Sequence, residues 1–167
     1  DVERSRGLGD VYKRQNMKNL KKIRLPESLK AIGESAFSGC SALADIVVPE
    51  GVTEIRQATF RDCDSLAAIE LPASVIEIDK FAFGRGLTTL VLNAPEVKID
   101  KYAFMKARDF STLIVPAGSA GYYRSLLAGM RVKVSVEEME EKIEEPTEEQ
   151  PSSLLDAFLK DPEKITE

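Results

Sequence analysis

The chain has 167 residues, of which 43% are hydrophobic and 31% charged, and it contains no His and no Trp. No apolar run reaches the roughly 20 residues that a transmembrane helix needs, so no part of the sequence is expected to insert into a membrane. The net charge of −5 is uneven: residues 137–167 hold 12 acidic and 3 basic residues, whereas residues 1–136 hold 16 acidic and 20 basic ones. Because these basic residues are scattered among acids, the composition argues against a nucleic-acid partner.

Residues 1–15 do not follow the pattern of the rest of the chain. The segment 5–15 resembles a transposase-type sequencing adapter translated in frame, and we interpret residues 1–15 as a non-native addition. A natural basic N-terminal tail is the alternative. Residues 16–19 match the end of a repeat, with Met17 where later repeats have Cys. This phase predicts a longer parent protein with further repeats and a signal peptide upstream.

Residues 16–119 contain an internal repeat, and a fixed period decides the architecture. Successive repeats start 23, 23, 21 and 23 residues apart. The starting residues are Leu20, Leu43, Leu66, Leu87 and Phe110. The third repeat is two residues short, and Gly84 and Gly86 lie at the gap, so we expect a shortened outer turn there.

Each repeat opens with two apolar residues that alternate with polar ones, and most repeats continue with Pro. This alternation predicts a short half-buried strand, which Pro ends because it cannot donate a hydrogen bond to a ladder. The apolar pairs are Ile23/Leu25, Ile46/Val48, Ile69/Leu71, Leu90/Leu92 and Leu113/Val115, followed by Pro26, Pro49, Pro72 and Pro116. A second apolar pair comes next, and then a small residue before Phe, where we expect a short helical turn on the outer side.

No single repeat can bury these apolar residues, so we expect the repeats to stack, with strands ~4.8 Å apart in one narrow parallel sheet. The pattern L-x-x-I-x-L-P-x-S-[LV]-x-x-I-x-x-x-A-F-x-x-C resembles the BspA-like class of bacterial leucine-rich repeats, over roughly residues 17–119. The resemblance implies a right-handed α/β solenoid on a secreted or cell-surface protein. It also implies adhesion or protein binding, with host or extracellular-matrix proteins among the partners, and supplies no catalytic residue and no cofactor.

The C-terminal part departs from the repeat. Residues 120–136 are predicted to form a cap: Ser119 can begin a short helix that ends before Gly129, and residues 130–136 alternate as a last strand. The acidic residues 137–167 are predicted to be a disordered linker or tail. Residues 153–159 are interpreted as a fraying end, with a small docking motif or the start of another domain as the alternatives.

Catalytic chemistry finds little support in the residues. Cys40 and Cys63 occupy equivalent positions one repeat apart and are expected to form a buried ladder, with a disulfide between neighbouring repeats as the alternative. A zinc site would need further ligands, and the chain has no His and no third Cys. Without His, a serine or cysteine nucleophile lacks its usual base. We therefore expect no enzyme activity, no metal site and no cofactor.

The outward positions of the predicted strands form the candidate binding face. Stacked solenoids use such a face to bind partners, and we expect a monomeric chain to bind a protein there. The candidate residues are Lys22, Arg24, Asp45, Val47, Glu70, Thr89, Val91, Thr112 and Ile114. The alternative function is a structural spacer that projects another domain of a larger protein.

Overall fold

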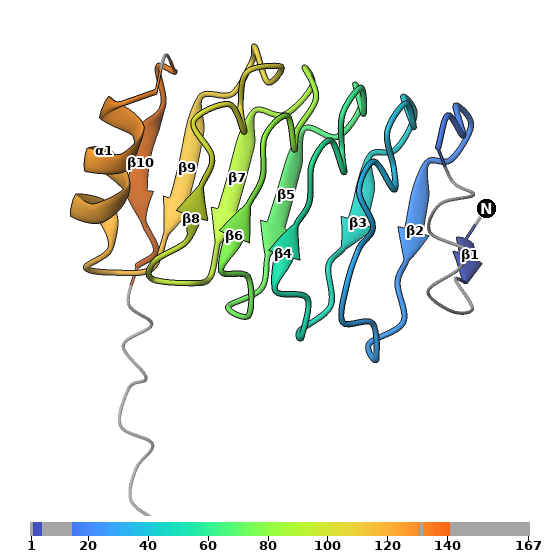
Figure 1. Ribbon diagram of the computed structural model, residues 1–167, viewed down its shortest axis with the longest axis horizontal. Coiled ribbons are helices and arrows are strands. Elements are labelled where there is room, and N and C mark those ends of the chain that lie inside the picture. The colour runs from blue at the N-terminus through green and yellow to red at the C-terminus, as the bar shows by residue number, and fades with distance from the viewer. Residues whose placement is uncertain (1, 5–14, 131, 141–167) are drawn as a thin grey trace, which may run out of the picture.

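Successive coils of the chain stack along the long axis of the molecule in the computed structural model, which describes residues 2–4, 15–130 and 132–140 (Figure 1). Each coil starts at one of the predicted repeat positions, so the chain makes about five turns of a parallel β-solenoid. The stacked-repeat architecture is confirmed. The acidic segment 141–167, with the proposed motif at 153–159, and the adapter-like residues 5–14 lie outside the described residues.

The predicted strands at the start of each repeat form a row of parallel strands. The sequence predicts one continuous sheet, but the structure divides it between β3 and β5 into the sheets β1–β2–β3 and β5–β7–β9–β10. The strands are β1 (Val2–Arg4), β2 (Lys22–Arg24), β3 (Asp45–Val47), β5 (Ala68–Leu71), β7 (Thr89–Leu92), β9 (Thr112–Val115) and β10 (Ser135–Glu138). Inward and outward residues alternate along these strands, as the pattern predicts.

A second sheet forms at the second apolar pair in the second, third and fourth repeats, but not in the first. Its parallel strands are β4 (Glu54–Ile55), β6 (Glu77–Ile78) and β8 (Lys98–Ile99). The outer side forms short turns with hydrogen bonds between residues three apart, such as Ala36 N–H to Gly33 O at 3.2 Å, and these turns do not extend into helices. The amide of Phe37 donates to Thr59 O at 2.9 Å and that of Phe60 to Ala82 O at 2.8 Å. Such amides bond to the next coil and alternate with amides that bond within their own turn, so no continuous helix forms.

A ladder of phenylalanine rings runs through the core. Phe37, Phe60, Phe83 and Phe104 stack in sequence with centroid distances of 5.7, 6.0 and 5.7 Å and interplanar angles of 5°, 11° and 8°. All four rings are buried. Because each ring packs against the rings of neighbouring coils, the ladder couples every coil to the next.

The shortened third repeat closes tightly on its neighbour. A Cβ atom on Gly86 would overlap the carbonyl oxygen of Asp64, and Gly84 approaches the amides of Asp62 and Cys63. Only glycine fits so close to another backbone. Residues 84–86 therefore form the shortened outer turn that the two-residue deletion predicts.

The repeat phase extends to the first described residues of the body. Asn16, Gly39 and Asp62 are 23 residues apart, and all have positive φ, of 62°, 76° and 59°. The amide of Leu20 donates to Met17 O, as that of Leu43 donates to Cys40 O. Met17 therefore takes the place of the repeated cysteine, as its phase predicts.

Strand β1 lies within residues 1–15, the segment interpreted from its sequence as a non-native addition. Val2 pairs with Lys22, an offset of 20 residues, whereas Lys22 pairs with Asp45 at the usual 23. Residues 2–4 therefore add an edge strand beside β2, without following the repeat period.

The C-terminal coil replaces its outer half with helix α1 (Ala120–Ala128), and then returns to the sheet as β10. Ser119 is the N-cap residue but makes no side-chain capping bond. Glu138 accepts the hydrogen bond from the Ala120 amide instead, at 2.9 Å. The last strand begins at Ser135, five residues later than predicted, and includes Glu137 and Glu138, which the sequence assigned to the tail.

The helix is anchored by tyrosines that reach back to the fourth coil. Tyr123 is fully buried and its hydroxyl donates to Ala94 O at 2.8 Å. Tyr122 is exposed and donates to Val97 O at 3.2 Å.

Replacing Phe60 by Ala should lower the free energy of unfolding by about 3–5 kcal/mol, because it leaves a cavity between two rings of the ladder. Urea denaturation followed by circular dichroism measures this change. Met105→Ala is the control, since Met105 is 62% exposed and its loss should cost less than about 0.5 kcal/mol. Equal effects would contradict the ladder as the coupling element.

Tyr123→Phe should cost about 1–3 kcal/mol, because the buried carbonyl of Ala94 loses its donor. Tyr122→Phe is the matched control, and it should cost less because water can replace an exposed hydroxyl. Thermal unfolding of both variants provides the comparison, and a larger loss in Tyr122→Phe would contradict this account of the cap.

Candidate functional site

The nine candidate residues all lie on the outward face of the strand row. Their side chains alternate along each strand with buried residues such as Ile23, Ile46 and Ile69. Arg24, Asp45, Val47 and Glu70 are exposed, and Lys22, Thr89, Val91, Thr112 and Ile114 are half-buried. The strand alternation therefore identifies the orientation of every candidate side chain, although their role in binding stays a prediction.

The strand register sorts these residues into two columns. Lys22 stands opposite Asp45, with which it forms an ion pair, and Arg24 stands opposite Val47. Beyond the step between β3 and β5 the columns resume with Thr89 opposite Thr112. The second column resumes as Glu70, Val91 and Ile114. The structure therefore brings the candidates together as two groups, one on each side of the step.

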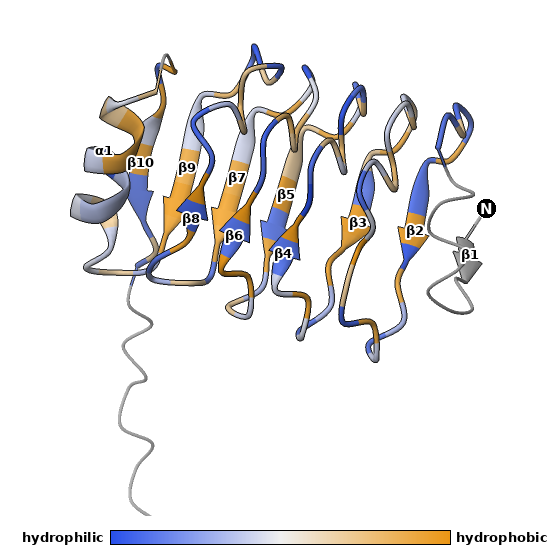
Figure 2. Cartoon of the chain, in the orientation of Figure 1, coloured by the Kyte–Doolittle hydropathy of each residue, from blue (hydrophilic) through white to orange (hydrophobic). Residues whose placement is uncertain are grey.

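The character of the face changes along the stack. Hydrophilic segments interrupt β2, β3 and β5, whereas β7 and β9 carry none (Figure 2). Apolar side chains are also exposed at its centre, where Val47 is 61% accessible. The face therefore combines charged and apolar groups.

A groove of about 1390 Å³ crosses the outward face at the step between β3 and β5. Five of the candidates contribute to its lining: Arg24, Asp45, Val47, Glu70 and Val91. Lys22, Thr89, Thr112 and Ile114 are not among the lining residues. The groove therefore covers only the middle of the predicted face, from β2 to β7.

Three further polar residues of the groove were missed by the sequence reasoning. Glu27 and Glu50 lie in the turns after β2 and β3, and Asn93 follows β7. Both glutamates stand directly after the repeated Pro, and Asn93 replaces that Pro in the fourth repeat. The substitution matters because the Asn93 amide donates to Leu71 O at 3.1 Å, a bond that Pro cannot make.

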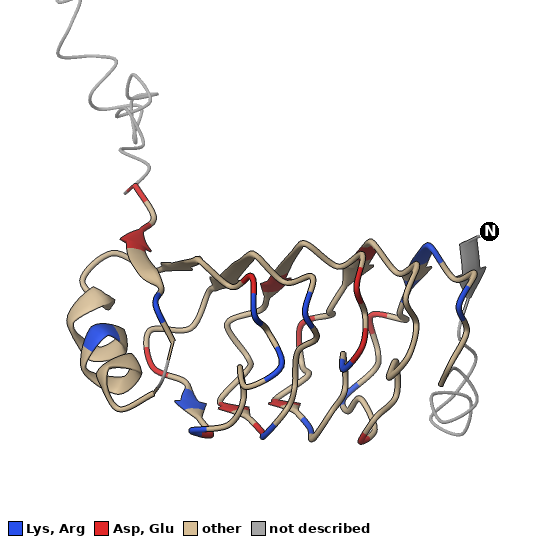
Figure 3. Cartoon of the chain, turned by 90° about the horizontal axis from the view of Figure 1, so that it is seen from above, with Lys and Arg blue, Asp and Glu red and all other residues tan. Residues whose placement is uncertain are grey.

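The groove is more acidic than basic. Glu27, Glu50 and Glu70 line it together with Asp45, against the single basic residue Arg24. Two of these acids already have partners: Asp45 pairs with Lys22, and Glu70 accepts from Asn93 Nδ2 at 2.7 Å. In Figure 3 basic and acidic segments are interspersed along the described stack without a continuous basic stripe.

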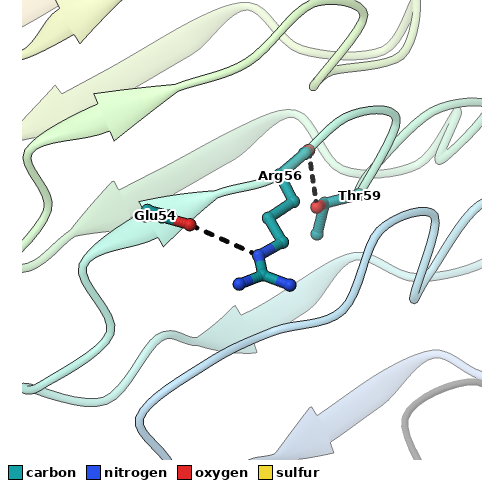
Figure 4. A network of polar contacts seen from close by, with 3 residues as sticks. All are labelled: Glu54, Arg56 and Thr59. Atoms are coloured by element: carbon teal, nitrogen blue, oxygen red, sulfur yellow. Dashed lines mark hydrogen bonds and ion pairs between the residues drawn. The ribbon is translucent and has the colours of Figure 1, made fainter.

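A polar cluster on another side of the second coil has a local structural role (Figure 4). Arg56 Nε lies 3.3 Å from Glu54 Oε2, and both side chains are exposed. The hydroxyl of Thr59, which is buried, donates to Arg56 O at 2.7 Å. The cluster satisfies a buried hydroxyl and leaves no group poised for chemistry.

The two cysteines are buried thiols within the core. Cys63 Sγ donates to Phe37 O at 3.1 Å, and Cys40 is fully buried beside it. Neither forms a disulfide in the structure. Over the described ranges, no three His, Cys, Asp or Glu residues gather as a metal-binding group.

The described residues also contain no helix long and apolar enough to span a bilayer.

Comparison with known proteins places this geometry in a family. The profile of BspA type leucine rich repeat regions matches residues 12–126, in six copies. The chain belongs to the BspA-type leucine-rich repeat family. No curated protein matches it.

Among the solved structures that match are two leucine-rich repeat proteins. One is a leucine-rich cell surface protein from Faecalibacterium prausnitzii A2-165, with a TM-score of 0.58 and 29% identity over 63% of this chain and 28% of that chain. The other is the T. pallidum leucine-rich repeat protein, with a TM-score of 0.57 and 31% identity over 70% of this chain and 53% of that one. The chain thus spans between about a quarter and a half of these proteins' length.

The thiol of Cys63 should stay protonated and unreactive while the chain is folded, because burial raises its pKa. Below about pH 8.5, the usual thiol value, both folded and unfolded chains keep the proton and stability is unaffected by this group. Above that pH only the unfolded chain releases it, so stability should fall as pH rises. Unfolding titrations between pH 7 and 10 measure this dependence.

The matching chemical test uses a thiol reagent such as dithionitrobenzoate. At pH 8 both cysteines should react only after denaturant is added. Rapid reaction of the native chain would contradict a packing role, and a Cys63→Ser variant identifies which thiol responds.

Proposed function

We propose that the chain is a non-catalytic protein-binding or adhesion module of a larger bacterial protein at the cell surface or secreted. The groove on the outward sheet face is the observation that carries the proposal. Family membership and the cell-surface neighbour support the location. A protein partner, such as a host or extracellular-matrix protein, fits this setting.

The dimensions of the groove favour a macromolecular partner. Small-molecule pockets usually enclose ~300–1000 Å³ and bury most of their ligand. The groove is larger, at about 1390 Å³, and lies on the open face of the sheet. Its exposed Val47 sits among charged side chains, an arrangement that can give an apolar anchor with a polar rim.

A structural spacer is the second candidate. Hydrogen bonds join the coils along the stack, for example Ser35 N–H to Gln57 O at 2.9 Å and Ala58 N–H to Lys80 O at 3.2 Å. Such bonding supports a rod that could project another domain. A spacer needs no specific surface, so substitutions on its outward face should have no effect on binding.

Val47→Arg separates the two functions. The variant should lose at least about tenfold in affinity for a protein partner, because it puts a charged side chain at an apolar contact. Its melting temperature should stay unchanged, since Val47 is exposed. Binding is measured by surface plasmon resonance against a panel of purified host-surface and extracellular-matrix proteins.

Ile76→Arg is the matched control, because Ile76 is 60% exposed but is not part of the groove lining. It should bind like the unaltered chain. If the panel contains a partner and both variants bind it equally well, the groove is not the contact. If no member of a broad panel binds, the spacer is favoured.

A further inference from the structure

The step between β3 and β5 is the one place in the described strand row where two neighbouring strands do not pair. At the step before it, the amides of Ala44 and Asp45 donate to Lys21 O at 2.9 and 3.3 Å. At the step after it, those of Thr88 and Thr89 donate to Ala67 O at 2.8 and 3.0 Å. Between β3 and β5 no ladder forms, and the two strands belong to different sheets.

The equivalent backbone groups of the third coil do not make these hydrogen bonds to the second coil. The Ala67 amide donates within its own coil to Ser65 O at 3.0 Å. Ser65 N–H to Ser41 O, at 3.1 Å, is the remaining bond at the entrance to these strands. Across the described part of β3 and β5, main-chain donors and acceptors therefore face the step without a partner strand.

The opening is confined to the outward face, because the same two coils are held together elsewhere. Strands β4 and β6 pair, with Glu54 opposite Glu77. At the turn after the strands, Gly51 N–H donates to Ser74 Oγ at 3.1 Å, and Ser74 Oγ donates to Val52 O at 2.8 Å. The second and third coils are thus held by hydrogen bonds on two sides, whereas on the third side β3 and β5 lie next to each other without forming a ladder.

The groove lies over this step and offers three kinds of contact together. Its lining includes Ile46 and Ile69, whose side chains are buried, so backbone of both strands contributes to the surface. Val47 and Val91 supply apolar surface on either side. Glu27 and Glu50 are exposed at the strand ends, where the described structure gives them no ion pair.

We propose that this groove binds an extended peptide segment of a partner protein, in which basic residues alternate with apolar ones. The proposal rests on the protein-binding function above and names the chemistry of its partner. Basic side chains complement the excess of acids in the groove, and apolar side chains meet the valines. Main-chain groups of Ile46 and Ile69 form part of the groove lining and can hydrogen-bond to polar groups of the segment.

An extended segment fits better than a compact ligand. From β2 to β7 the groove crosses three strand steps, or ~14 Å at the usual spacing. An extended chain covers that distance in about four residues, with alternate side chains pointing to the surface. Acidic segments are disfavoured by the same charges that attract basic ones.

A labelled synthetic peptide tests the proposal with the full chain. The probe is a fluorescein-labelled peptide of about nine residues in which lysine alternates with valine and serine. Fluorescence anisotropy should show saturable binding that weakens when salt is raised from about 0.1 to 0.5 M. The same peptide with glutamate for lysine should not bind, and one with serine for every valine should bind at least about tenfold more weakly.

A pair of charge-reversed variants locates the site. The double variant Glu27→Lys with Glu50→Lys should weaken binding of the lysine peptide by about tenfold or more. Glu34→Lys with Glu96→Lys changes the net charge equally at exposed positions outside the groove and should bind almost normally. An equal loss in both double variants would mean nonspecific attraction and would overturn the proposal.

Failure of this proposal can be told from failure of the protein-binding function. If the lysine peptide does not bind but Val47→Arg still loses a protein partner, the groove binds a partner of other chemistry. If neither experiment responds, the binding function falls as well. Sedimentation velocity covers the remaining occupant: a dimer that Val47→Arg dissociates would assign the groove to a second copy of the chain and overturn the proposal.

Discussion

Every coil of this chain buries its apolar side chains against the coils on either side, and the rest of the structure depends on that contact. A single repeat is too short to enclose its own leucines, isoleucines and phenylalanine. The stacked rings of Phe37, Phe60, Phe83 and Phe104 show the solution, since each ring covers its neighbours. Hydrogen bonds from one coil to the next then fix the phase of the stack.

The 23-residue period could be predicted from the sequence, because packing between coils requires apolar residues at equivalent positions. Buried positions at a fixed spacing can arise only if equivalent residues meet in successive coils, and the observed register of Lys22 with Asp45 follows the 23-residue step. The outward orientation of the candidate residues follows from the same alternation. The helix α1 was also accessible, through the change of pattern after Ser119 and the Gly129 that follows it.

Other features depend on contacts that the pattern does not encode. The outer turns do not extend into helices, because alternate amides bond to the next coil. Glu137 and Glu138 resemble the acidic tail in composition, yet they belong to β10 and pair with β9. The opening between β3 and β5 occurs where the two repeats have ordinary sequences, and we find no single residue that explains it.

The candidate surface gains its character from this irregularity. A regular ladder would present a closed strand row with two columns of side chains. The open step adds main-chain groups and depth at the middle of the face, next to Val47 and the glutamates that follow the repeated prolines. The groove that we propose as the binding site thus lies where the repeat is least uniform.

The open step also bears on how the molecule resists force. A stack with contacts only between neighbours is as strong as its weakest interface. With no ladder between β3 and β5, a pull along the long axis would be carried between these coils by the β4–β6 pair, the hydroxyl of Ser74 and the stacked rings of Phe60 and Phe83. An occupant that bridges the groove would add contacts across this interface and share the load.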